Sequence, residues 1–371
     1  MNRAESVIRK IVALADVKIN GERDWDIQVD NPHFYKRILR DGPIAFGESY
    51  MDGWWDSERL DDLVYRLLRA DLKHSISPLK LVFPVIMAKI FNPQRRSRAF
   101  NIGEHHYDIG NDLFQKMLDP RMVYTCAYWK DAKTLKQAQE DKLDLICRKI
   151  GLQPGMTVLD IGCGWGGFAK YAAEKYGVEV TGVTVSKEQI ELGRSLCDGL
   201  AVEFRLQDYR DIQGTFDRIV SIGMFEHVGV KNCRIFMRTV SRCLAKDGIF
   251  LLHTIGANSR KDAVDPWTNK YIFPDGMLLT VAQIARAAEE IFVMEDWHSM
   301  GTHYDPTLMA WMANVDRHWD SLDHDRYDER FYRMWRFFLM SAAGAFRARF
   351  NELWQIVFTR SGIDGGYASI R

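Results

Sequence analysis

A glycine-rich turn at residues 158–167 limits the fold of this chain more than any other segment. Its sequence, VLDIGCGWGG, begins as an apolar strand, passes through Asp160 and continues with Gly162, Gly164 and Gly166. Glycine has no Cβ, so the backbone can turn tightly there and a ligand can approach it closely. A helical pattern follows at once, and such turns next to a helix start are shared by nucleotide-binding folds. The segment therefore predicts a strand–turn–helix unit beside a ligand.

Strands and helices alternate regularly around that turn. Apolar runs of strand length are separated by segments whose apolar residues recur with helical spacing. Alternating β and α units of this length indicate a parallel, doubly wound α/β sheet. The expected strands are 157–162, 178–186, 202–208, 216–223 and 248–255, and the expected helices include 135–150, 167–177 and 187–199.

Composition argues against several classes of protein. Lys plus Arg and Asp plus Glu both number 50, so the net charge is zero, and no nucleic-acid partner is expected. The six cysteines form neither a CxxC pair nor a zinc-ligand spacing, and they predict reduced thiols in a cytosolic protein without a metal site. No stretch approaches the ~20 apolar residues of a spanning helix. We therefore expect a soluble protein or one that lies on a membrane surface.

Two domains are expected. Residues 1–91 predict a small, mainly helical N-terminal domain that ends in a strongly apolar segment, 79–91. A polar, basic, Pro-containing stretch follows, so we place a linker at 92–104 and the larger domain at 105–371. The apolar segment and the arginines after it either press into an anionic bilayer or form a buried helix and a solvated linker. The first alternative makes residues 1–91 a domain that docks on lipid.

The form of the turn and the end of a later strand narrow the ligand. The turn reads D-x-G-x-G-x-G, whereas dinucleotide sites read G-x-G-x-x-G. The third expected strand ends in LQDYRD, where Asp208 is suited to accept a hydrogen bond from an adenine amino group and Tyr209 to stack on the ring. These features resemble the class I S-adenosylmethionine (AdoMet) methyltransferases and imply their Rossmann-like fold. That class usually has an acidic residue after the second strand, where this chain has Thr184 and Gln189.

Four reactive side chains lie outside the glycine turn: Cys126, Glu226, His253 and Tyr304. Each has a plain structural interpretation, as a buried thiol, a helix cap, a core histidine and a packing aromatic. Glu226 and His253, however, follow or end strands whose carboxyl ends should meet beside the turn. This convergence favours a shared site.

Seven motifs in one order carry a more specific resemblance. The chain resembles the cyclopropane-fatty-acyl-phospholipid synthase family, with its relatives the mycolic acid cyclopropane synthases, over residues 100–360. The N-terminal YMDGWW segment resembles the smaller domain of that family. The resemblance implies transfer of a methylene from AdoMet to the cis double bond of a phospholipid acyl chain. The motifs are YTCAYW, LDIGCGWGG, QDYRD, FEHVG, LLHTIG, DPWTNKYIFPDG and TLMAW.

The implied reaction needs a proton acceptor and a dry site. The double bond attacks the AdoMet methyl, a carbocation forms, and loss of a proton from the new methyl closes the ring. Water would trap the cation, and the acidified proton needs an acceptor. The resemblance assigns that role to a bound bicarbonate and implies no metal. Its implied holders are Cys126, Glu226, His253, Tyr304 and the backbone of Ile255.

The resemblance also extends the cofactor site to the residues just before Cys126. Segment 105–114, HHYDIGNDLF, is expected to form part of a lid over AdoMet. The cofactor residues implied by the turn and the resemblance together are Tyr124, Thr125, Asp160, Gly162, Gly164, Gly166, Thr184, Gln189, Asp208 and Tyr209.

The implied substrate is part of a membrane. The resemblance implies unsaturated phospholipids at the membrane surface as partners, a homodimer, and a cytoplasmic protein attached peripherally to the inner face of the cell membrane. The aromatic, Met-rich stretch 256–350 fits a protein core or an acyl pocket equally well. Two other functions stay open, namely N-methylation of a small amine and AdoMet sensing without catalysis. The extra N-terminal domain argues against the first, and the four reactive side chains argue against the second.

Overall fold

The computed structural model describes most of the chain. The predicted apolar segment 79–91 and the predicted linker 92–104 lie outside the described residues. Within the described part, no helix has the length and apolar character needed to cross a membrane. The described residues are 3–70, 110–259, 264–274 and 276–371.

The chain forms two compact units, and each is discontinuous in sequence. Residues 262–274 and 304–351 group with the N-terminal segment, although they follow the glycine turn in the chain. The predicted domain boundaries, which depend on the linker, stay a prediction. We call the units helical and sheet. The helical unit comprises Met1–Phe91, Asp262–Pro274 and Tyr304–Asn351, and the sheet unit comprises Asn92–Lys261, Asp275–His303 and Glu352–Arg371.

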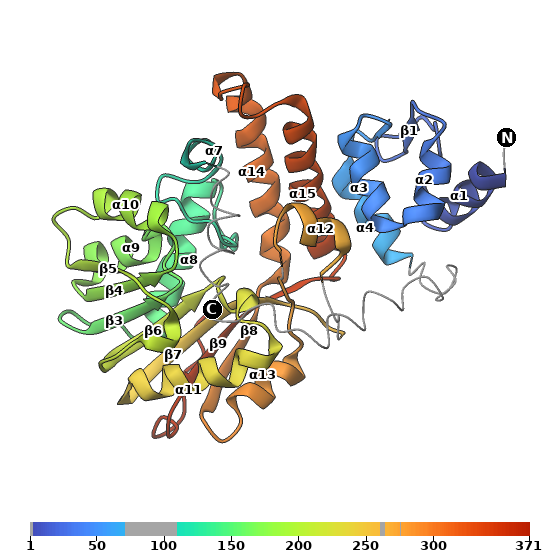
Figure 1. Ribbon diagram of the computed structural model, residues 1–371. Coiled ribbons are helices and arrows are strands. Elements are labelled where there is room, and N and C mark those ends of the chain that lie inside the picture. The colour runs from blue at the N-terminus through green and yellow to red at the C-terminus, as the bar shows by residue number, and fades with distance from the viewer. Residues whose placement is uncertain (1–2, 71–109, 260–263, 275) are drawn as a thin grey trace. The chain divides into compact units, whose positions relative to one another are not determined.

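Seven strands form the centre of the sheet unit, in the order β5-β4-β3-β6-β7-β9-β8 (Figure 1). The five strands expected from the sequence are all present and parallel. Two strands that the sequence pattern does not predict extend the sheet, because β9 pairs antiparallel with both β7 and β8. β9 is buried along its whole length, so its sequence lacks the alternation of a half-exposed strand. The strands are β3 (Thr157–Ile161), β4 (Glu179–Thr184), β5 (Val202–Leu206), β6 (Phe216–Ile222), β7 (Leu244–Gly256), β8 (Val293–Ser299) and β9 (Glu352–Thr359).

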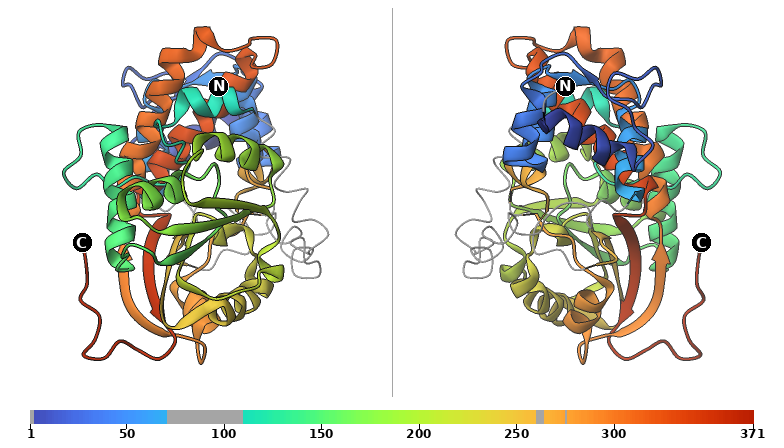
Figure 2. Two further views of the ribbon diagram at one scale, coloured as in Figure 1. Left: turned by 90° about the vertical axis from the view of Figure 1, so that its left-hand side faces the viewer. Right: turned by 90° about the vertical axis from the view of Figure 1, so that its right-hand side faces the viewer.

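Helices cover both faces of this sheet, as Figures 1 and 2 show. Successive strand residues point to opposite faces. Leu251 of β7 accordingly packs in a core with α8 and α9, whereas Leu252 packs in a second core with α11 and α13. This is the doubly wound arrangement that the sequence predicts. The helices are α7 (Asn111–Met117), α8 (Leu135–Lys149), α9 (Gly167–Tyr176), α10 (Lys187–Leu196), α11 (Cys233–Cys243) and α13 (Val281–Ala288).

Three separate stretches of chain assemble the helical unit. α15 packs against α3, α4 and α14. Gly344 of α15 permits the close approach to α4, because a Cβ there would lie 2.4 Å from the carbonyl oxygen of Asp61. Arg347 then pairs with Asp61 at 2.7 Å and with Asp305 of α14 at 2.8 Å. The elements are α1 (Arg3–Ala13), β1 (Gln28–Val29), α2 (Phe34–Asp41), α3 (Pro43–Met51), β2 (Trp55–Asp56), α4 (Leu60–Arg69), α12 (Pro266–Tyr271), α14 (Tyr304–His318) and α15 (Glu329–Arg347).

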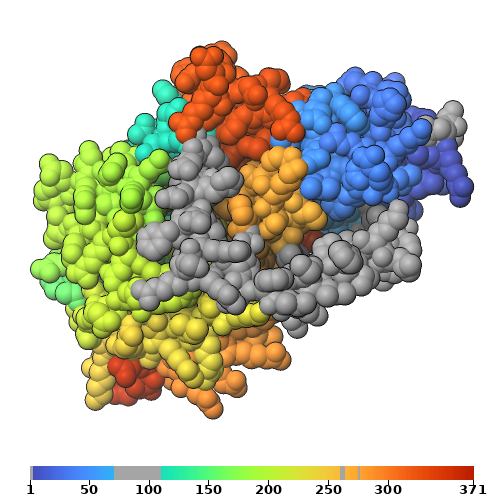
Figure 3. All heavy atoms as spheres, viewed as in Figure 1, coloured from blue at the N-terminus to red at the C-terminus, as the bar shows by residue number. Residues whose placement is uncertain are grey.

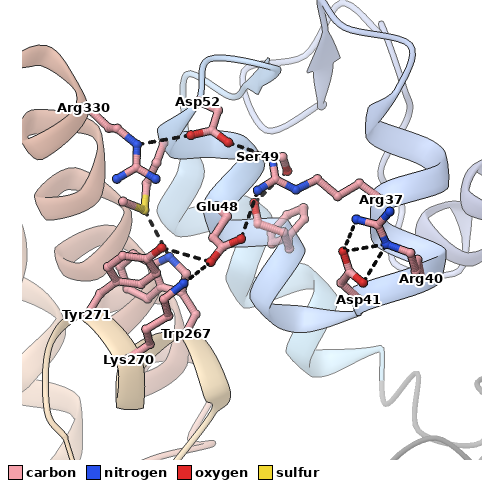
Figure 4. Close-up of polar contacts among 12 residues, drawn as sticks. Arg37, Arg40, Asp41, Glu48, Ser49, Asp52, Trp267, Lys270, Tyr271 and Arg330 are labelled. Atoms are coloured by element: carbon pink, nitrogen blue, oxygen red, sulfur yellow. Dashed lines mark hydrogen bonds and ion pairs between the residues drawn. The ribbon is translucent and has the colours of Figure 1, made fainter.

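One carboxylate fastens α12 to α3, and the space-filling view shows α12 against the N-terminal helices (Figure 3). Glu48 of α3 accepts hydrogen bonds from Lys270 at 2.7 Å, from Tyr271 at 2.9 Å and from Arg37 at 3.0 Å (Figure 4). Burial raises the pKa of Glu48, but these three donors outweigh it and hold the pKa below its ordinary value. The chain between β7 and α13 is therefore anchored within the helical unit.

Candidate active site

A pocket in the sheet unit lies at the carboxyl ends of β3, β4, β5 and β6. Doubly wound sheets bind ligands at this edge, because the loops there leave a crevice beyond the strand ends. The glycine turn and one side of α8 also contribute to its wall. Nine of the ten residues predicted for the cofactor line the pocket, namely Tyr124, Thr125, Asp160, Gly162, Gly164, Thr184, Gln189, Asp208 and Tyr209.

The glycine turn depends on backbone angles that side chains resist. Gly162, Gly164 and Gly166 have φ of 84°, 55° and 84°, in the left-handed region that favours glycine. A Cβ on Gly162 would also lie 2.5 Å from the Met224 side chain. Gly166 does not line the pocket; it caps the start of α9, and a Cβ there would lie 2.5 Å from the ring of Phe204. Its contribution is to the shape of the turn.

Helix α7 packs against the same turn. Trp165 donates its indole N–H to Asn111 Oδ1 at 3.0 Å, and the ring of Phe114 lies 5.0 Å from the rings of both Trp165 and Tyr124. The predicted lid segment is 105–114, of which residues 105–109 lie outside the described residues. The described remainder contacts the cofactor loop, and its action as a lid stays a prediction.

The residues predicted for the nucleoside end lie at the ends of β4 and β5. Thr184 donates its hydroxyl to Gln189 Oε1 at 2.8 Å, and both side chains are buried. Asp208 accepts hydrogen bonds from the backbone N–H of Arg210 at 2.9 Å and from its guanidinium at 3.0 Å. Each carboxylate oxygen can still accept a further bond. Burial raises the pKa of Tyr209 to about 12, so its hydroxyl stays protonated at neutral pH.

The pocket lining also includes a buried lysine that the sequence did not single out. Lys142 of α8 is completely buried and donates to the hydroxyl of Thr125 at 2.8 Å. Burial lowers the pKa of Lys142 to about 8, although neighbouring carboxyls, including Asp160, raise it. Burial also raises the pKa of Asp160 to about 7, and Lys142 opposes that shift. An amine and a carboxyl, both with a pKa shifted toward neutrality, therefore line the same pocket.

Glu226 lies just after β6, in a short 3₁₀ turn over Phe225–His227. Its Oε1 accepts the backbone N–H of Ile255 in β7 at 2.5 Å. Its Oε2 is buried and has no hydrogen-bond partner among the described residues. Burial raises the pKa of Glu226 to about 7, although the bond from Ile255 opposes the shift. This carboxyl can thus hold or release a proton at neutral pH.

His253 lies two residues before Ile255 on β7 and is also buried. Its Nδ1 is 3.3 Å from Gln355 Nε2 of β9, and its Nε2 has no hydrogen-bond partner among the described residues. Burial lowers the pKa of His253 well below its ordinary value, and Lys142 and Lys149 add to the shift, so the imidazole is neutral at neutral pH.

The remaining predicted residues are Cys126 and Tyr304. The Cys126 thiol is fully buried and donates to the carbonyl of Ala127 at 3.3 Å. Tyr304 begins α14 in the helical unit, where its ring stacks on Phe346 with centroids 4.5 Å apart. Its participation in a site with Glu226 and His253 stays a prediction.

Sequence reasoning also missed pocket residues besides Lys142. His227 lines the pocket, and burial lowers its pKa to about 4. It follows Glu226 directly, and no pattern in the sequence gives it a role of its own. Met122, another lining residue, has a φ of 56°, a backbone state with no signal in the sequence. The signal for Lys142 is its spacing, seven residues before Lys149 and seven after Leu135, which places all three on one side of α8.

Strand order and pocket position together define the class of protein. The reversed β9 between β7 and β8, the helices on both faces and the glycine turn below the pocket are those of a class I AdoMet-dependent methyltransferase. The structure of the cyclopropane synthase MmaA2 from Mycobacterium tuberculosis matches 70% of this chain and 97% of its own, with a TM-score of 0.66 and 32% identity. Mycolic acid cyclopropane synthase CmaA1, solved with SAH and CTAB, matches the same shares with a TM-score of 0.65 and 33% identity.

Sequence comparison then identifies the family. The family model for mycolic acid cyclopropane synthetase matches residues 94–356. The cyclopropane-fatty-acyl-phospholipid synthase of Escherichia coli strain K12 is 52% identical over 361 residues, which cover 97% of this chain and 94% of that protein. This chain belongs to the mycolic acid cyclopropane synthetase family, as the resemblance of its motifs implied.

Proposed function

We propose that this protein uses AdoMet to convert a cis double bond of a phospholipid acyl chain into a cyclopropane ring. The alkene carbon forms a bond to the methyl carbon as the bond from that carbon to sulfur breaks. The new methyl then loses one proton and closes on the cationic carbon, and S-adenosylhomocysteine and a proton leave. The name of the Escherichia coli relative supports this substrate class.

The structural observation that carries the proposal is a pair of buried polar atoms beside the cofactor pocket. Glu226 Oε2 and His253 Nε2 lack partners among the described residues, and the Ile255 N–H ties the Glu226 turn to the strand of His253. Buried polar atoms without partners are costly and rare. A small polar group that reached both atoms would satisfy the carboxyl and the neutral imidazole.

Bicarbonate, the group that the family resemblance implies, fits these atoms. A neutral imidazole can donate from Nε2, and a carboxyl whose pKa is near 7 can either donate to an anion or accept its hydroxyl. We propose that Cys126, Glu226, His253 and Tyr304 hold it. The Ile255 amide already donates to Glu226, so it would support bicarbonate only indirectly, by holding the Glu226 carboxyl in place. When bound, bicarbonate supplies a base for the proton released during ring closure.

The protein's own residues supply the dry surroundings that the cation requires. Glu226 and His253 are almost completely buried, and so is Cys126. Water that reached the cation would give an alcohol instead of a ring. Because His253 is neutral, it adds no positive charge of its own beside the sulfonium and the cation. Exclusion of water and control of charge are therefore the contributions of this chain.

The proposal extends to the lipid and its setting. We propose unsaturated phospholipids at a membrane surface as substrates, a peripheral position on the inner face of the cell membrane, and a homodimer. CmaA1 is complexed with SAH and with CTAB, a surfactant that has a long alkyl chain. A relative with the same fold thus takes up an alkyl chain together with the cofactor product.

The test uses AdoMet labelled with three deuterons on its methyl group and vesicles of dioleoyl phosphatidylglycerol. Mass spectrometry should show one added carbon per converted double bond, loss of the olefin, and two of the three deuterons in the product. Three retained deuterons would indicate simple methyl transfer and overturn the proposal. A water-soluble amine that is methylated without lipid would support the alternative N-methyltransferase function.

A further inference from the structure

Lys142 is the one fully buried lysine that lines the cofactor pocket among the described residues. Its ammonium has three N–H donors, and the structure gives it a single hydrogen bond, to Thr125 Oγ1 at 2.8 Å. A buried ammonium is costly unless charged or polar groups surround it. Two donors of Lys142 therefore remain to be satisfied by whatever enters the pocket.

The charged neighbours of Lys142 do not fill this role. Asp119 already accepts the backbone N–H groups of Val123 and Arg121, both at 3.0 Å. Asp160 lines the pocket with Lys142, yet its Oδ1 is buried without a hydrogen-bond partner among the described residues. The pocket lining thus presents an amine with donors still available and a carboxyl with one oxygen that lacks a partner among the described residues. A ligand that carries both a carboxylate and an ammonium matches this pair.

AdoMet has such an end, since its amino-acid part carries one carboxylate and one ammonium. Asp160 lies near the end of β3, within the glycine-rich segment, and Thr125, which also lines the pocket, accepts the hydrogen bond of Lys142. Thr184, Gln189, Asp208 and Tyr209 also line the pocket, at the ends of β4 and β5, and are suited to the uncharged nucleoside. The pocket lining thus offers charged groups for the amino-acid end of the cofactor and hydrogen-bonding groups for its nucleoside end.

We propose that Lys142 binds the carboxylate of AdoMet and so selects for a cofactor with an intact amino-acid end. The inference deepens the proposed function, since it assigns a residue to its cofactor, but it concerns binding alone. Asp160 faces the ammonium of the same ligand. A bond from an ammonium to a carboxylate in a buried site is among the stronger hydrogen bonds.

The test compares two ligands with Lys142→Met in the full-length protein, by isothermal titration calorimetry without lipid. The ligands are AdoMet and decarboxylated AdoMet, which keeps the sulfonium and the amine but lacks the carboxylate. We expect K142M to lower the affinity for AdoMet by at least about tenfold and to change the affinity for decarboxylated AdoMet by less than about threefold. An equal loss for both ligands, or no loss for either, would overturn the proposal.

Two further variants separate charge from structure. Lys142→Gln can still donate to Thr125 but carries no charge, so it should lose AdoMet affinity as K142M does; full affinity in K142Q would contradict the proposal. Lys149→Met is the matched control, because Lys149 lies two turns further along α8, is 1% exposed, binds His298 and does not line the pocket. It should leave the ratio of the two affinities unchanged. These titrations contain no lipid. They therefore test the binding role of Lys142 even if the assay with vesicles yields no cyclopropane product.

Discussion

Replacing Glu226 by Gln should stabilise the protein at alkaline pH while it slows turnover. Burial raises the pKa of Glu226 from 4.5 to about 7, so the folded state holds a proton that the unfolded chain releases. A raised carboxyl pKa stabilises the fold fully below pH 4.5, and this stabilisation is lost as pH rises through 7. A pKa difference of one between the folded and unfolded states corresponds to about 1.4 kcal/mol. The wild-type protein should therefore lose about 2–3 kcal/mol of stability through this group between pH 5 and pH 8.

Glutamine removes this dependence of stability on pH, because its side chain does not titrate. Its carbonyl oxygen can still accept the Ile255 N–H, so the main structural bond survives. The melting temperature of E226Q, relative to that of the wild type, should rise by roughly 3–4 °C between pH 5 and pH 8. Circular dichroism at both pH values measures it, with Glu191→Gln on the exposed face of α10 as the control. If the difference in melting temperature between E226Q and the wild type stayed constant across this pH range, the raised pKa assigned to the buried Glu226 would be refuted.

Three further measurements test other parts of the structure. Gly162→Ala should weaken AdoMet binding by about tenfold or more, because φ is 84° and the Met224 side chain occupies the space of a Cβ. Gly177→Ala is its control, with φ of 63° and no atom closer than 3.6 Å, and should leave binding intact. Glu48→Gln should lower the unfolding free energy of the helical unit by about 1–3 kcal/mol at pH 7, since a depressed carboxyl pKa stabilises the fold above its ordinary value; the difference should shrink toward pH 4. Removal of dissolved bicarbonate should slow turnover without changing AdoMet affinity, and an unchanged rate would indicate another base.

The glycine turn and the parallel strands were predictable because their signals are local. A strand, a tight turn and a helix each leave a pattern within about ten residues, and Asp160 lies inside one such pattern. β9 was not predictable in the same way. It follows α15 of the helical unit, pairs with β7 across about a hundred residues of chain, and is buried on both faces. Nothing within its eight residues specifies that position.

The helical unit shows a second limit of local patterns. α14 and α15 follow the sheet in the chain, but they pack with α3 and α4, which precede it. Gly344 permits this contact, since only a residue without a Cβ fits against Asp61. In the sequence, however, that glycine is one small residue within an aromatic helix. The sequence around Gly344 gives no indication of which segment of the chain will approach it.

The charge states of the candidate site depend on these same distant elements. The motif LLHTIG identifies His253, but its neutral state results from burial under α8 and from Lys142 and Lys149 on that helix. Its hydrogen-bond partner, Gln355, comes from β9, where it is paired in register with His253 on one side and His298 on the other. A motif can therefore name the residues of a reaction without stating whether they carry a charge. Here the charge is decided by a helix that precedes the glycine turn and by a strand that lies about a hundred residues beyond the histidine.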